Sequence, residues 1–310
     1  MKLLTKVMQA DISRQMSFKA RDLDLCVINA LDGSMPSDYL LDCLMMYQNR
    51  DGGFGNGLHI DNYNPNSSVY QVYEAFRLLD MLDYDSRSSH ELYDTIINKA
   101  CNYLYNREVL TENRWNPNTL TNNDFAHSHE YTFNDENLKY FGYHPTAAIL
   151  GYTLVFCKPT KAYYKKALKL TQFAIDYLYQ AESLTKQEFI SFNILLKCLK
   201  KANQYISDIA KIEEKLIKLA KEAVSLDFDD INAIHPLDAA LYLNDDELNQ
   251  KKDEELNHII DSIAPHGLWN HNGDWGYDVY AEQDSAMLKW IGAETVNNYY
   301  ALKLHNKIEK

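Results

Sequence analysis

The stretch that decides the fold is Gln48-Asn49-Arg50-Asp51-Gly52-Gly53-Phe54-Gly55, which follows a predicted helix at 37–49 and precedes another at 66–81. Four of the chain's 11 glycines lie in 51–57. A sharp reversal after a helix needs positive φ, which glycine adopts without steric cost. The Asp51 carboxylate can accept hydrogen bonds from nearby amides, Phe54 can cover the turn, and Gln48 can reach the next hairpin. The stretch therefore predicts a tight turn that joins two helices and holds them to a neighbour.

This turn resembles the Gln-x-x-Asp-Gly-Gly-Trp/Phe-Gly turn of the squalene–hopene cyclase and protein prenyltransferase β-subunit superfamily. A weaker copy at 269–276 keeps Gly273, Trp275 and Gly276 but has no matching glutamine. In that superfamily such turns tie together the hairpins of a double ring of helices. The resemblance implies an all-α fold of the α/α toroid type, and a structural role for residues 51–54.

Shorter matches make most of the chain similar to a narrower group of uncharacterised bacterial proteins with prenyltransferase-like toroids. The matching segments are 21–24, 51–58, Asp61 with 64–68, 123–127, 144–148 and 275–278. This resemblance implies a single toroid domain over residues 1–310. It implies no activity, because one fold can carry unrelated functions.

Helical periodicity dominates the chain. Apolar residues recur at i, i+3, i+4 and i+7 in 164–178 and 209–223. Further helices are predicted at 20–30, 37–49, 66–81, 90–106, 144–156, 184–201, 230–242, 252–263, 282–290 and 294–308. Pro65, Pro145 and Pro236 each open a predicted helix and mark a weak repeat. About twelve helices, or six hairpins, either stack into an open solenoid or close into a ring.

Composition narrows the function classes. The formal net charge of −13, without a clustered basic stripe, argues against nucleic-acid binding and against docking on an anionic membrane. No uncharged apolar run is long enough to span a membrane, and the N-terminus has no signal-peptide pattern. The five cysteines are widely spaced, which is typical of reduced thiols. We expect a cytoplasmic protein.

The sequence does not support the catalytic chemistry of two enzyme classes of the superfamily. Protein prenyltransferases hold Zn²⁺ with an Asp, a Cys and a His, but no cysteine follows Cys198. Squalene–hopene cyclases use an Asp-x-Asp-Asp acid, which Asp227-Phe228-Asp229-Asp230 matches only in spelling, because it precedes a helix and suits a solvated cap. We predict neither a cofactor nor a resident metal.

One long loop gathers titratable side chains. Asp124, His127, His129 and Glu130 lie within seven residues of each other, at 124–130. The two imidazoles could act as acid and base, with a carboxylate orienting one ring, or could ligate a metal if the loop is extended. Alternatively, the loop is polar and these groups satisfy its own backbone.

The loops at 50–65, 107–140 and 264–281 could meet at one end of a toroid. We expect Asp61 and Asp278 to point into one pocket there, together with His127, His144 and Trp275. Helices that begin near the three prolines would aim N–H groups at the same opening. The candidate catalytic residues are Asp61, Asp124, His127 and Asp278, and the candidate ligand-binding residues are His59, His129, Glu130, His144, Trp275 and Trp290. Trp290 lines this cavity or fills the core.

Three functions remain open, and whether the protein is an enzyme is undecided. The first is a toroid with a central polar-aromatic pocket for a small ligand; an isoprenoid would require an apolar lining. The second is a carbohydrate-active α/α barrel, a hydrolase or lyase that uses paired carboxylates beside aromatic platforms. The third is a non-enzymatic scaffold that binds a protein on the toroid rim.

Overall fold

The computed structural model describes residues 2–106, 109–111, 113–202, 208–271, 273, 275–276 and 280–310. Within these residues the chain is built almost wholly from helices. They are α1 (Lys6–Lys19), α2 (Asp22–Asp32), α3 (Tyr39–Met45), α4 (Val69–Met81), α5 (Glu91–Leu104), α6 (Asp135–Phe141), α7 (Thr146–Phe156), α8 (Ala162–Gln180), α9 (Lys186–Ala202), α10 (Ile209–Ala223), α11 (Pro236–Ala240), α12 (Asp246–Asp261) and α13 (Glu282–Leu304). Two 3₁₀ turns, η1 (Leu120–Asp124) and η2 (His129–Tyr131), and a ribbon of β1 (Leu110–Thr111) and β2 (Arg114–Trp115) lie between α5 and α6.

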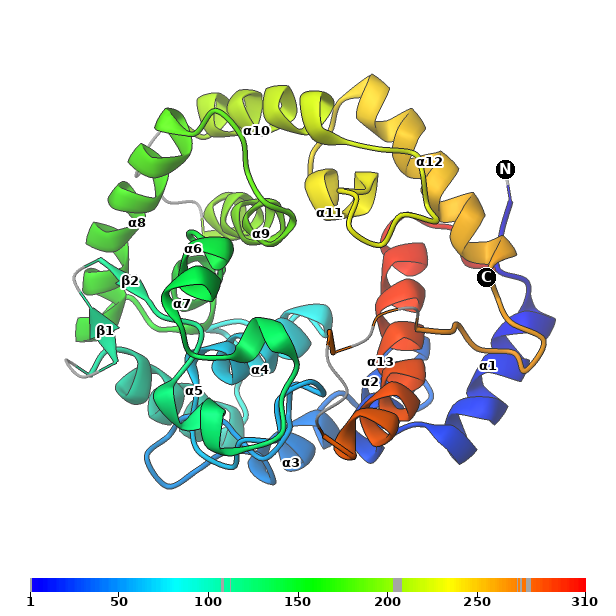
Figure 1. Cartoon of the computed structure of the whole chain (residues 1–310), viewed down its shortest axis with the longest axis horizontal. Coiled ribbons are helices and arrows are strands. Elements are labelled where there is room, and N and C mark those ends of the chain that lie inside the picture. The colour runs from blue at the N-terminus through cyan, green and yellow to red at the C-terminus, as the bar shows by residue number, and fades with distance from the viewer. Residues whose placement is uncertain are drawn as a thin grey trace.

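The helices form two concentric layers (Figure 1). The outer layer holds α1, α3, α5, α8, α10 and α12, and the inner layer holds α2, α4, α7, α9, α11 and α13. Outer and inner helices alternate along the chain, which gives six pairs, and the short α6 is additional. The predicted all-α toroid is therefore confirmed.

Contacts between the chain termini close the ring. The backbone N–H of Leu4 donates to the carbonyl of Lys307 at 2.8 Å, and that of Glu309 donates to the carbonyl of Leu4 at 3.0 Å. Next to this junction, α13 packs against both α1 and α2. The helical hairpins thus form a closed ring and not an open solenoid.

The inner helices α4, α9 and α11 have corresponding ends close together. Lys186 and Asp238, near the starts of α9 and α11, form an ion pair at 3.0 Å. Near the other ends, Lys197 of α9 pairs with Asp80 of α4 at 2.8 Å. The N-terminal ends of these helices therefore share one end of the ring, and the loops that precede them meet there.

The glycine turn has the structural role predicted for it. The Gln48 side chain donates to the carbonyl of Gly52 and, across the hairpin, to that of Ile96 on α5. The Asp51 carboxylate accepts from the Gly53 amide at 3.0 Å and from the Ser67 hydroxyl at 2.7 Å. Phe54 is fully buried beneath the turn. The turn thus connects α3 to α5 and to the segment that enters α4.

Several helix predictions need correction. Helix α1 was not predicted, because only Ile12 and Met16 of its residues are buried and its apolar pattern is weak. Helix α6 was not predicted either, because its seven residues are too few to show a helical period. The two helices predicted at 282–290 and 294–308 are the single helix α13, and the helix predicted at 230–242 is only α11. Of the three prolines, Pro236 does occupy the first turn, whereas Pro65 precedes the α4 N-cap, Ser68.

Two further expectations concern membrane-spanning helices and thiols. None of the helices in the described ranges is long and apolar enough to cross a membrane. All five cysteines are free thiols, with Cys101, Cys157 and Cys198 buried and Cys26 and Cys43 half-buried.

Replacing Gly52 by alanine should destabilise the fold more than replacing Gly33. Both glycines have positive φ, 95° and 83°, so alanine is strained by about 1–2 kcal/mol at either position. A Cβ at Gly52 would also lie 2.3 Å from the Lys99 carbonyl oxygen, whereas one at Gly33 would meet nothing within 4 Å. We expect Gly52→Ala to cost about 2 kcal/mol more than Gly33→Ala in urea unfolding. Equal losses would mean that the turn is not held tightly against α5.

Candidate functional site

Asp61 lies where two distant parts of the chain meet. Its Oδ1 accepts a hydrogen bond from the Trp275 indole N–H and another from the Trp290 indole N–H, each at 2.7 Å. Asp61 is 8% exposed and Trp275 1% exposed. Within the described ranges no group bonds to the second oxygen, Oδ2. A largely buried carboxylate is thus held in place through one oxygen, while the other remains open to a further donor.

An aromatic cluster surrounds the neighbouring His59. The His59 ring lies 4.9 Å from Tyr70, 4.9 Å from Tyr131 and 5.7 Å from Trp290, measured between ring centroids. Its Nε2 is 3.4 Å from the Tyr131 hydroxyl, and its Nδ1 has no partner among the residues placed by the structure. Burial lowers the pKa of His59, so the imidazole is neutral at pH 7.

Glu130 brings a second carboxyl group to the Asp61 site. Its side chain is half-buried next to Tyr131. Burial, with a smaller contribution from the nearby Asp61 carboxylate, raises the pKa of Glu130 to about 7, and a hydrogen bond with Tyr131 partly opposes this shift. A carboxyl group of this kind can hold or release a proton near neutral pH.

The rest of the 124–130 loop divides between buried and exposed groups. Both ring nitrogens of His127 are engaged: Nδ1 lies 2.6 Å from the Phe125 carbonyl oxygen and Nε2 lies 3.0 Å from the Thr132 hydroxyl. The His129 side chain is exposed, although its backbone N–H donates to the Trp275 carbonyl at 3.0 Å. Asp124 is also exposed. In the described part of the chain no three metal-ligating side chains converge.

His144 lies deeper in the ring wall than His59. It is fully buried, its Nδ1 is 2.7 Å from the Ser191 hydroxyl, and the Tyr70 and Tyr73 rings pack against it. Burial lowers the pKa of His144 to about 3. A ligand would have to displace these tyrosines to reach it.

The predicted pairing of Asp61 with Asp278 cannot be located, because Asp278 lies outside the described residues. Asp61 has Trp275 and Trp290 as partners, and Trp275 precedes Asp278 by three residues in the sequence.

Two residues near this site were not predicted from the sequence. The His271 ring stacks on the Trp290 ring at 4.6 Å with an interplanar angle of 11°, and His271 Nδ1 lies 4.0 Å from Glu294 Oε2. Burial raises the pKa of Glu294 to about 7 and lowers that of His271. Glu294 follows Trp290 by four residues on α13, so it shares a helix face with Trp290, and this spacing was the available signal.

Ion pairs line the inner helices beyond this cluster. Arg77 pairs with Glu74 at 2.9 Å and donates to the Asn297 side chain at 2.8 Å. The Asp238–Lys186 and Asp80–Lys197 pairs continue along the inner layer. Their side chains keep partial solvent exposure. The inner helices therefore carry charged groups as well as aromatic ones.

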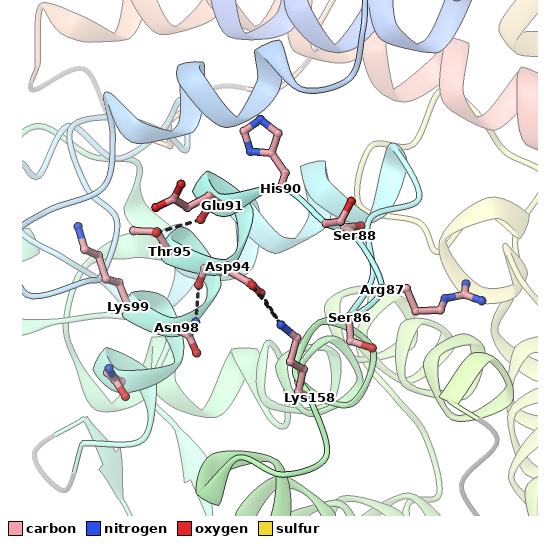
Figure 2. Close-up of a pocket in the computed structure, with 12 residues that line it drawn as sticks. Ser86, Arg87, Ser88, His90, Glu91, Asp94, Thr95, Asn98, Lys99 and Lys158 are labelled. Atoms are coloured by element: carbon pink, nitrogen blue, oxygen red, sulfur yellow. Dashed lines mark hydrogen bonds and ion pairs between the residues drawn. The ribbon is translucent and has the colours of Figure 1, made fainter.

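The two pockets described in the structure lie elsewhere. The larger, about 740 Å³, is a groove on the outside of the ring beside α5, lined by residues 86–91, Asp94, Thr95, Asn98, Lys99, Asn102 and Lys158. Its side chains point in different directions, and its ion pair, Lys158–Asp94 at 3.1 Å, bridges two surface segments (Figure 2). The second, about 390 Å³, lies between α1, α2 and Tyr299. None of the candidate site residues lines either pocket.

The fold therefore places the protein in the structural class of closed α/α toroids. No protein-family model matches the chain, and no curated protein matches it. Among solved structures, the chain is similar to the type II terpene cyclase MstE from Scytonema in its apo form, with 10% sequence identity and a TM-score of 0.49 over 96% of this chain and 97% of that one. At this level of identity the likeness concerns the fold alone.

Substituting Glu294 by glutamine should stabilise the protein at pH 8 but not at pH 5. Because the folded-state pKa is raised to about 7 from 4.5, the folded protein binds this proton more tightly than the unfolded chain, so stability falls as pH rises through that range. Glutamine cannot ionise, so the variant avoids the cost of a partly buried negative charge at this position. Since the side chain is 31% exposed, we expect a gain of only about 1 kcal/mol at pH 8.

This gain would be measured by urea unfolding at both pH values. The exposed Glu222 on α10 supplies the control Glu222→Gln, which should show no such pH dependence. An identical response in the two variants would show that Glu294 is well solvated.

Proposed function

We propose that the protein binds a small polar ligand at the end of the ring where the inner helices begin, next to Asp61, Trp290 and Glu130. The observation that carries this proposal is the Asp61 carboxylate, which two indoles hold through Oδ1 while Oδ2 remains available. Ligand sites commonly combine aromatic surfaces with a few well-placed polar groups. Asp61 would accept a hydrogen bond from the ligand, and the half-buried Trp290 ring would contact its apolar parts.

The inner wall supports a polar ligand over an isoprenoid. An isoprenoid chain gains its binding energy by leaving water for an apolar surface. Here the inner helices carry three ion pairs, formed by Glu74, Asp80 and Asp238 with their cations. Inserting a hydrocarbon would desolvate these charges, which is costly. A ligand with its own hydrogen-bonding groups avoids this penalty.

Acid–base chemistry is within reach of the same residues. Glu130 and Glu294, each with a pKa raised to about 7 by burial, can donate or accept a proton near neutral pH. Whether the protein uses them for catalysis or only for binding depends on the ligand. A cytoplasmic location remains a prediction, which is based on the widely spaced cysteines. That the protein does not bind nucleic acid also remains a prediction, which is based on the net negative charge.

The ligand proposal is tested by intrinsic tryptophan fluorescence against a panel of sugars, sugar acids, amines and isoprenoid alcohols. A polar compound should change the emission, and Asp61→Asn should weaken its binding at least tenfold, about 1.4 kcal/mol. Asparagine can still accept both indole bonds through its Oδ1, so the fold should be retained. The exposed Asp229 gives the control Asp229→Asn, which should bind normally.

Preferential binding of the isoprenoid alcohols would refute the polar assignment. Unchanged affinity in Asp61→Asn would remove Asp61 from the site.

A second candidate function is glycosidic-bond cleavage. Such enzymes combine a protonated carboxyl group of raised pKa with a neighbouring carboxylate. Glu130, with its pKa raised to about 7, and Asp61 would fill these roles, and the Trp290 ring would provide a sugar platform.

If aryl glycosides are hydrolysed, Glu130→Gln should reduce kcat by about 10²–10⁴-fold, because the proton donor is lost. Substrates with leaving groups that need no protonation should be affected less than the others. An equal loss for every leaving group would assign Glu130 a structural role in that reaction.

A further inference from the structure

Two sets of carboxyl groups on the inner side of the ring differ in their partners. In the first set, each carboxylate has its own cation: Glu74 with Arg77 at 2.9 Å, Asp80 with Lys197 at 2.8 Å and Asp238 with Lys186 at 3.0 Å. The second set consists of Asp61, Glu130 and Glu294. Within the described ranges, no lysine or arginine forms an ion pair with any of these three.

The second set belongs to one connected site. Asp61 accepts a hydrogen bond from the Trp290 indole N–H, and the His271 ring stacks on the Trp290 ring. His271 then approaches Glu294 to 4.0 Å. Glu130 joins the group from the η2 turn, where the Asp61 carboxylate is close enough to influence its titration.

Two cations on the helices beside this site, Lys289 on α13 and Arg77 on α4, already have hydrogen-bonding partners. The Lys289 ammonium group donates to the Tyr63 hydroxyl at 2.7 Å and lies 4.4 Å from the centre of that ring. Arg77 is held by Glu74 and Asn297. Lys186 and Arg77 act on Glu294 only at longer range, since neither forms an ion pair with it. The imidazoles of His59 and His271 are kept neutral by burial, which lowers the pKa of each.

We infer that the ligand of this site is an organic cation carrying an ammonium group. This inference rests on the proposed function and specifies its ligand class. Three carboxyl groups without cations of their own would neutralise the ammonium charge, with Asp61 Oδ2 as an open acceptor. Aromatic faces attract a cation through their negative electrostatic surface. The half-buried Trp290 ring lies at this site, and the buried Tyr131 and Tyr70 rings pack behind it around His59. A neutral sugar would leave the charge of the Asp61 carboxylate without a cation.

The test compares each cation with an uncharged compound of similar shape. Choline is paired with dimethylbutanol, and butylammonium with butanol, in calorimetric titrations of the full chain at constant ionic strength and pH 8. We expect at least one cation to bind tenfold or more tightly than its neutral partner. In Glu294→Gln and Glu130→Gln this preference should fall at least fivefold, whereas in Glu222→Gln it should be unchanged.

The outcomes separate this inference from the proposed function. Equal binding of a cation and its neutral partner, or a preference that survives both glutamine substitutions, overturns the inference. Binding of neutral sugars without binding of either cation also overturns it, and leaves the proposed polar-ligand function standing. Absence of binding by every compound in both panels overturns both proposals. Circular dichroism of each variant confirms that the helices are retained.

Discussion

Closure of the ring is the constraint on which the rest of this structure depends. The hydrogen bonds that join Leu4 to Lys307 and Glu309 hold the first and last segments together, and α13 packs between α1 and α2. Without closure, the hairpins would form a row whose two ends face water. With closure, the inner helices surround a common centre (Figure 1).

The candidate site is a direct consequence of this closure. Asp61 precedes α4, whereas its partners Trp275 and Trp290 lie 214 and 229 residues later in the chain. Only a ring brings the second hairpin next to the last one. The same closure places His271 and Glu294 beside the Asp61 group, so the site is shared between the two halves of the sequence.

The inner wall shows how a polar interior is kept stable. Buried charges are costly unless they are paired, and Arg77, Lys186 and Lys197 each have a carboxylate partner from the inner helices. Asp61, Glu130 and Glu294 depart from that rule. Burial raises the pKa values of Glu130 and Glu294, which means that their charged forms are destabilised where no cation pairs with them. Groups of this kind are often retained for function, because packing alone gives no reason to keep them.

The sequence by itself determined the helical class, the tight turn at 48–55 and most of the helices, because these depend on local periodicity and on glycine's backbone freedom. It also singled out Asp61, Trp275 and Trp290. It did not show that Asp61 bonds to both indoles, nor that His271 and Glu294 belong to their group, because residues more than 200 positions apart carry no local signal of contact. Whether the hairpins stack or close was likewise decided by tertiary structure. That choice depends on the fit between the first and last helices, which no single segment encodes.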